Sequence, residues 1–129
     1  MSGSVTHFEI PVDDMARAQA FYRDAFGWQI SDLPDMDYTL VRTTPTGDDG
    51  VPAEPGAING GMVPRGEPFL HPIVTISVED VDSALASIER LGGKTVVGRT
   101  PVGAMGFAAY AKDTEGNVIG LWESTASAG

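Results

Sequence analysis

The chain has 129 residues, the size of one domain, and 42% of them are hydrophobic, which is enough for a buried core. It contains no cysteine, which excludes disulfides, thiolate metal sites and thiol nucleophiles. Eight basic against 18 acidic residues give a formal net charge of -10, which argues against a nucleic-acid partner because phosphate contacts need clustered lysine and arginine.

The first residues, MSGSVTH, have neither a basic start nor an apolar run of the kind that directs export. No apolar stretch in the chain approaches the ~20 residues that are needed to span a bilayer. We therefore expect a cytoplasmic protein without a membrane partner.

The next residues, HFEIPV at 7–12, alternate between two kinds of side chain. Phe8, Ile10 and Val12 are apolar, whereas His7 and Glu9 are polar. A strand projects successive side chains to opposite sides of its sheet. The pattern therefore predicts a strand whose even-numbered face meets a core and whose odd-numbered face carries a histidine and a carboxylate.

This strand and the helix predicted after it are repeated later in the chain. A shift of 66 positions places residues 8–30 on residues 74–96 without a gap, and Asp14 falls on Asp80. Asp14, or its neighbour Asp13, is predicted to cap the first helix, because an aspartate oxygen accepts an unpaired N–H there. The strand, the helix cap and the closing glycine keep the same spacing in both halves of the chain, which indicates one βα unit that is used twice.

Further strands are predicted after each helix, at 28–31, 38–43 and 57–62 in the first half and at 94–97, 107–112 and 117–122 in the second. The fold class is therefore α+β, a single domain of residues 1–129 with two βαβββ modules, 5–62 and 73–123, and a linker at 63–72. The Gly-, Pro- and Asp-rich segment 43–56 is predicted to be a loop, and 101–107, PVGAMGF, a mobile lip.

Two βαβββ modules, together with HFEIPVDDMARAQAFYRDAFGW at 7–28 and FAAYAKDTEGNVIGLWE at 107–123, resemble the vicinal oxygen chelate superfamily. The resemblance is to its glyoxalase/bleomycin-resistance protein/dioxygenase-like branch. It implies a mixed β-sheet that is curved into a cup with flanking helices. It also implies a small-molecule ligand in the cup, a divalent metal at its base in many members, and a homodimer.

In metal-dependent members of this superfamily, the first and last strands of each module supply the ligands. The corresponding positions here are His7, Asn59, Ile73 and Gly120. Only the histidine is a common metal ligand, because asparagine is a poor one and the other two offer no donor atom. We therefore expect no cofactor and disfavour a divalent metal, while a rearranged set of His7, Glu9 and His71 stays open.

The residues that parity directs into the cup are the predicted ligand contacts: His7, Glu9, Asn59, Thr75, Gly120 and Trp122. Trp122 is preferred over the other aromatic candidates, which are Trp28, Tyr38, Phe107 and Tyr110. Gly60, Gly61 and Gly120 indicate either room for a ligand or a sharp bend of the sheet. The alternative to a ligand contact for His7 is that it is an ordinary polar residue at the start of a strand.

Glu9 is the candidate catalytic residue, because a carboxylate that faces an apolar cup suits a general base. Its alternative is a surface acid, partly hydrated or paired with an arginine such as Arg42. The favoured function is metal-independent binding of an organic metabolite or antibiotic. Two alternatives stay open: a metal-dependent lyase, isomerase or dioxygenase-like enzyme built around His7, and a non-catalytic dimeric interaction module.

Overall fold

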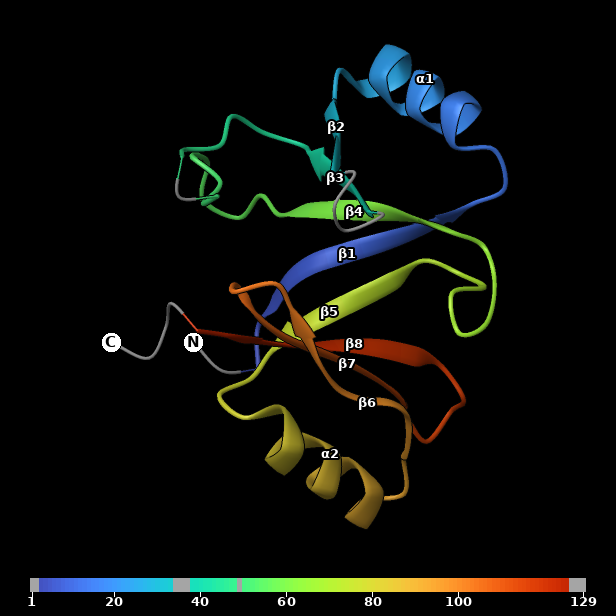
Figure 1. Cartoon of the computed structure of the whole chain (residues 1–129), viewed down its shortest axis with the longest axis vertical. Helices are drawn as coiled ribbons and strands as arrows, with labels where there is room; N and C mark the ends of the chain where they lie inside the picture. The colour runs from blue at the N-terminus through green and yellow to red at the C-terminus, as the bar shows by residue number, and fades with distance from the viewer. Residues whose placement is uncertain (1–2, 34–37, 49, 126–129) are drawn as a thin grey trace. The chain divides into compact units, whose positions relative to one another are not determined.

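The computed structural model describes residues 3–33, 38–48 and 50–125. Its elements are β1 (Val5–Val12), α1 (Met15–Phe26), β2 (Gln29–Leu33), β3 (Tyr38–Arg42), β4 (Asn59–Pro64), β5 (Ile73–Ser77), α2 (Val81–Arg90), β6 (Lys94–Val102), β7 (Gly106–Lys112) and β8 (Val118–Ser124) (Figure 1). This order confirms the α+β class and the two βαβββ modules. The chain divides into two compact units, His7–Pro72, here called the first module, and Ile73–Gly129 with Met1–Thr6, here called the second module.

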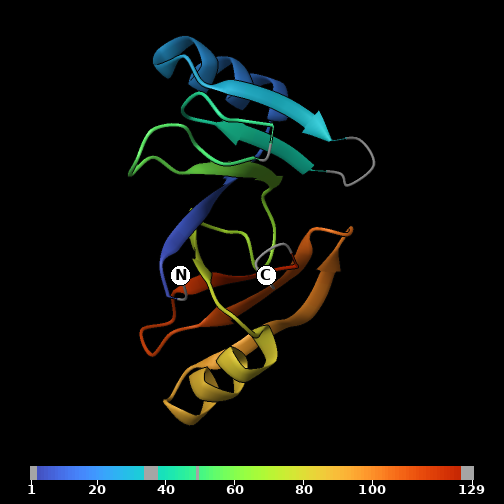
Figure 2. The same ribbon diagram turned by 90° about the vertical axis from the view of Figure 1, so that its left-hand side faces the viewer.

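The strands of the first module follow the order β2-β3-β4-β1. β1 pairs with β4 in parallel, with His7 opposite Asn59 and Glu9 opposite Gly61. β3 is antiparallel to β4 and to β2. Figure 2 shows the antiparallel pair of β2 and β3 beside α1. The parallel pairing requires a crossover between β1 and β4, which α1, β2 and β3 provide.

The predicted strand phase of β1 is confirmed by the core of the first module. Val12, Val41 and Met62 form a buried cluster, and Phe8 and Ile10 pack against it. Residues Met15, Ala18 and Tyr22 of α1 complete this core. The even-numbered residues of β1 therefore face the helix, and His7 and Glu9 lie on the opposite side of the sheet, which we call the helix-free face.

Both ends of α1 follow the sequence signals. The Asp14 side chain accepts a hydrogen bond from the Arg17 N–H at 3.0 Å, so Asp14 rather than Asp13 is the N-cap. Gly27 ends the helix with φ 75°, a left-handed conformation that glycine adopts without steric cost. Asp80 is the N-cap of α2, as the internal repeat predicts, and its side chain accepts a hydrogen bond from the Asp82 N–H.

The second module repeats this arrangement with the strand order β5-β8-β7-β6. β5 and β8 are parallel, with Thr75 opposite Gly120, and β7 is antiparallel to both of its neighbours. Its core contains Val81 and Leu85 from α2 and Leu121 from β8. Since Leu121 faces the helix, Gly120 and Trp122 project to the helix-free face of this module.

The largest difference from the predicted elements is β6, which continues to Val102 instead of ending at Val97. Gly98 and Pro101 suggest a break, but β6 is the last strand in its sheet order, and such edge strands tolerate proline. Register shifts on either side of Val97 absorb the irregularity. β4 also extends to Pro64, two residues into the segment that was predicted to be the linker.

The segment predicted to be a mobile lip is the hairpin between β6 and β7. The hydroxyl of Thr125 donates to the Ala104 carbonyl at 2.9 Å, and its N–H donates to the Met105 carbonyl at 3.0 Å. Thr125 follows β8, so the hairpin is tied to the end of the neighbouring strand. Across the described ranges 3–33, 38–48 and 50–125, no helix has the length and apolar character to cross a bilayer.

Candidate functional site

Three polar side chains meet on the helix-free face of the first module. The Tyr38 hydroxyl lies 2.8 Å from Nε2 of His7 and donates to Oε2 of Glu9 at 2.9 Å. Glu9 is only 5% exposed, and His7 is half-buried. Two residues on the same face of β1 and the first residue of β3 therefore form one hydrogen-bonded group, which we call the His7–Tyr38–Glu9 cluster.

A glycine on β4 makes room for this cluster. Gly61 lies opposite Glu9 on β1 and opposite Leu40 on β3. A Cβ atom at Gly61 would overlap the hydroxyl and ring of Tyr38. The tyrosine thus fills the space that the missing side chain leaves, and close approach of another group is the physical reason for this strand glycine.

Burial lowers the pKa of His7 below its ordinary value of 6.5, although the nearby charge of Glu9 acts in the opposite direction. Glu9 from the same strand and Tyr38 from β3 are the titratable groups in this cluster, and the facing β4 residues, Asn59 and Gly61, carry no charge. Desolvation disfavours the imidazolium form, so the neutral form of His7 predominates at pH 7 and above.

We expect His7 to make the protein less stable as the pH falls below 6.5. The unfolded chain then binds a proton that the folded chain does not, so the free energy of unfolding falls until the pH reaches the lower pKa of the folded state. The slope is at most about 1.4 kcal/mol per pH unit for one proton. Urea unfolding between pH 7.5 and pH 5 should show this slope in the wild type and in His71→Gln but not in His7→Gln; equal slopes in all three proteins would contradict it.

Asn59, the predicted ligand contact opposite His7, is bonded to the loop that follows β3. Its side-chain oxygen accepts the N–H of Thr43 at 2.9 Å, and its amide nitrogen donates to Thr46 Oγ1 at 2.9 Å. The side chain therefore holds the start of the loop against β4. Nothing in the spacing of the sequence indicated this role.

In the second module, the predicted contacts Thr75, Gly120 and Trp122 share the helix-free face. A Cβ atom at Gly120 would lie 2.8 Å from Thr75 Oγ1 and 3.4 Å from the ring of Tyr110. The two modules therefore share a feature: a glycine on the last strand, opposite the repeat-related residues Glu9 and Thr75, is approached by a tyrosine from the preceding strand.

Two other aromatic candidates lie on the helix side of their modules. Trp28 stacks on Tyr22 of α1, with ring centroids 4.9 Å apart and an interplanar angle of 7°. Phe107 packs against the core of the second module and lies under the guanidinium of Arg99, 3.6 Å from the ring centroid. Neither ring is on the face that carries the predicted ligand contacts.

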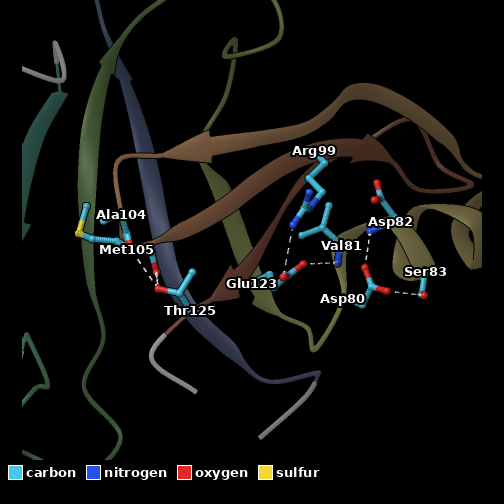
Figure 3. Close-up of polar contacts among 9 residues, drawn as sticks. All are labelled: Asp80, Val81, Asp82, Ser83, Arg99, Ala104, Met105, Glu123 and Thr125. Carbon is cyan, nitrogen blue, oxygen red and sulfur yellow. Dashed lines mark hydrogen bonds and ion pairs between the residues drawn. The ribbon is translucent and has the colours of Figure 1, made fainter. Parts of the chain in front are cut away.

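Glu123 lies on the helix side of β8, because it alternates with Trp122 along the strand, and it contacts the start of α2 (Figure 3). Its Oε1 accepts the N–H of Val81, the first residue of α2, at 3.0 Å. Its other carboxylate oxygen lies 3.9 Å from Arg99. The carboxylate lies on the helix side of β8 and supplements the Asp80 cap, where a negative charge is favourable at a helix N-terminus.

The donor atoms present do not fit a divalent cation. The four positions implied by the superfamily resemblance hold a histidine whose Nε2 is bonded to a phenol, an asparagine that is bonded to a loop, a buried isoleucine and a glycine. No three His, Cys, Asp or Glu side chains lie close enough to share an ion in the part of the chain that the structure describes. The alternative set of His7, Glu9 and His71 is therefore not assembled.

Comparison with known proteins agrees with this architecture. Residues 4–44 match the family described as bleomycin resistance protein-like N-terminal. Curated proteins from Mycobacterium bovis and Mycobacterium tuberculosis, both called "Putative glyoxylase CFP32", are 26% identical over 124 residues, 95% of this chain and 46% of their own length. The chain thus spans about half the length of the curated relatives it matches.

Solved structures share the fold at lower sequence identity. Methylmalonyl-CoA epimerase from Mycobacterium tuberculosis is 19% identical, with a TM-score of 0.62 over 95% of this chain and 88% of that one. A hypothetical protein from Bacillus halodurans is 14% identical, with a TM-score of 0.65 over 100% and 99% of the two chains. A single-site variant of the Streptomyces coelicolor methylmalonyl-CoA epimerase is 18% identical, with a TM-score of 0.65 over 98% and 97%.

The fold is thus that of proteins built from two repeated βαβββ modules. The match of residues 4–44, the curated relatives and the shared fold agree with the resemblance of the sequence to the glyoxalase/bleomycin-resistance branch of the vicinal oxygen chelate superfamily.

Proposed function

We propose that the protein binds a small organic molecule and that the His7–Tyr38–Glu9 cluster is the polar part of its binding site. The observation that carries the proposal is a nearly buried carboxylate, linked through a phenol to a neutral imidazole, on the face of the sheet that no helix of its module covers. Small-molecule sites typically combine apolar surroundings with a few placed polar groups.

The proposed binding site also includes the other predicted ligand contacts, which are Asn59, Thr75, Gly120 and Trp122. Each projects from the helix-free face of its own module, as judged from the strand register. The proposal takes residues 1–129 as one ligand-binding domain with modules at 5–62 and 73–123. The superfamily resemblance also supports a homodimer, which sedimentation velocity would reveal.

The charge of the chain favours a neutral or cationic ligand. Epimerases of this fold have been solved with methylmalonyl-CoA and with 2-nitronate-propionyl-CoA, and such coenzyme A compounds carry several phosphate charges. A protein with a net charge of -10 and a pI near 4.3 repels polyanions at neutral pH. An organic amine or an uncharged polar compound is therefore favoured over a coenzyme A ester.

If the bound molecule reacts, Glu9 is the proposed general base. Its carboxylate accepts a hydrogen bond from the Tyr38 hydroxyl, and a proton that Glu9 takes from the bound molecule would be returned by Glu9 to another atom of that molecule. The names of the curated relatives favour a glyoxalase-like reaction, so methylglyoxal with glutathione is the first substrate pair to assay.

A thermal-shift screen tests the binding proposal with three sets of small compounds: amines, uncharged polar compounds and polyanions. A compound at 100 times its Kd stabilises the folded state by about 2.7 kcal/mol, which raises the Tm of a domain of this size by roughly 10 °C. We expect hits among the amines or uncharged compounds, and Glu9→Gln should weaken an amine hit tenfold or more, which corresponds to about 1.4 kcal/mol.

Glu115→Gln is the matched control, because it removes the same charge from an exposed turn between β7 and β8. A screen without any hit, or equal affinities for the two variants, would contradict the proposal. Purified protein with a stoichiometric divalent metal that is lost in His7→Ala, together with turnover of methylglyoxal and glutathione, would favour the metal-dependent alternative instead.

A further inference from the structure

The phenol of Tyr38 determines which nitrogen of His7 carries a proton. A phenol has a single proton, and a carboxylate can only accept one. The Tyr38 proton is directed at Glu9 Oε2, so the phenol oxygen must accept in its short contact with His7 Nε2. Nε2 is therefore the protonated nitrogen of the ring.

We infer that a phenol hydroxyl, and not a cation, bridges His7 and Glu9, and that this bridge fixes His7 as the Nε2–H tautomer with Nδ1 as an acceptor for a donor group of the ligand. The first part stands on the hydrogen bonds alone. The last part rests on the proposed function, because it assigns a ligand group to Nδ1. The favoured ligands are compounds that present an N–H or O–H to this nitrogen.

The accessibility of Nδ1 follows from the hydrogen bonds of the described residues. There, Tyr38 is the hydrogen-bond partner of the His7 ring, through Nε2. No fully buried side-chain nitrogen or oxygen lacks a hydrogen-bond partner within those same residues. Nδ1 is therefore not fully buried, and a neutral imidazole that is protonated on Nε2 keeps the Nδ1 lone pair as an acceptor.

The bridge also explains why this histidine does not fit the metal position of the superfamily. A metal ion binds a histidine nitrogen through its lone pair, which Nε2 does not have when it is protonated. Binding at Nε2 would require the bond to Tyr38 to break and the proton to leave. Gly61 favours the phenol further, because any side chain there would overlap its hydroxyl.

Long-range ¹H–¹⁵N NMR on the full chain tests the bridge without any ligand. The protein has two histidines, so His71→Gln assigns the signals of His7. At pH 8 we expect the Nε2–H tautomer for His7 in the wild type. Tyr38→Phe, which keeps the ring over Gly61 and removes only the hydroxyl, should shift both ring nitrogens of His7.

Tyr22→Phe is the control, because it removes a hydroxyl on the helix side of the same module. An Nδ1–H tautomer in the wild type, or unchanged His7 nitrogens in Tyr38→Phe, would overturn the bridge. Selective broadening of the His7 signals by one equivalent of CoCl2, ahead of those of His71, would overturn the exclusion of a cation.

Two ammonium salts test the assignment of Nδ1 as an acceptor. Methylammonium chloride presents N–H donors, whereas tetramethylammonium chloride has the same charge and none. At equal ionic strength, we expect methylammonium alone to shift the Nδ1 resonance of His7. Equal responses to the two salts would overturn this part and leave the bridge standing, while an empty compound screen would count against the proposed function only.

Discussion

Replacing Met62 with alanine is expected to lower the free energy of unfolding by about 2–5 kcal/mol, the usual cost of deleting a buried long aliphatic side chain. Met62 is 0% exposed and packs with Val12 and Val41 under α1. The surrounding backbone belongs to paired strands and can collapse only partly into the space left behind. Urea unfolding that is monitored by circular dichroism measures the loss.

Met105→Ala is the matched control for this substitution. Met105 is 52% exposed in the turn between β6 and β7, so the same deletion there should change stability by less than about 0.5 kcal/mol. His7 should keep its tautomer in Met62→Ala, because Met62 lies on the other side of the sheet from the His7–Tyr38–Glu9 cluster. Equal costs for the two methionines would show that β4 does not bury its even-numbered face.

Gly61→Ala should cost about 1–3 kcal/mol by the opposite mechanism, which is overpacking. The added methyl group would occupy the position of the Tyr38 hydroxyl, so the ring must move and its bonds to His7 and Glu9 must break. The expected result is therefore a loss of stability together with the NMR changes of His7 that Tyr38→Phe produces.

Gly98→Ala separates overpacking from the general effect of the substitution. A Cβ atom at Gly98, in β6, meets nothing within 4 Å. Alanine there should be neutral or slightly stabilising, because it reduces the freedom of the unfolded chain. The double variant Gly61→Ala/Tyr38→Ala should lose less than the sum of its two single variants, since removal of the ring relieves the clash. Strict additivity would contradict this account of Gly61.

The fold was predictable because its signals are local and occur twice. Alternation in residues 7–12 defined the two faces of β1, and Asp14 and Gly27 ended α1 where expected. Strand boundaries were less accurate where a tertiary feature overrides a local one. Gly98 and Pro101 are strand breakers by composition, and the bulges of an edge strand accommodate both.

The candidate site was only partly predictable, because the sequence of a strand does not determine which residues of a distant strand lie opposite it. His7 and Glu9 were named from their parity, but Tyr38 was named only as an aromatic candidate. Its hydroxyl joins them because β3 pairs beside β4 at a glycine. Asn59 was considered as a metal ligand, and its partners in the loop after β3, Thr43 and Thr46, lie 16 and 13 residues away in the sequence.

The two modules differ in how much of the chain each needs before it can form. The first uses one continuous stretch, His7–Pro72, which is complete before α2 has been synthesised. The second needs segments from both sides of it: Gly3 and Ser4 pair with Ser77, and Glu123 reaches back to the start of α2. During synthesis, therefore, α2 emerges some 40 residues before the carboxylate that supports its first turn. Removing residues 3–4 or residues 123–125 therefore removes contacts that lie within the second module.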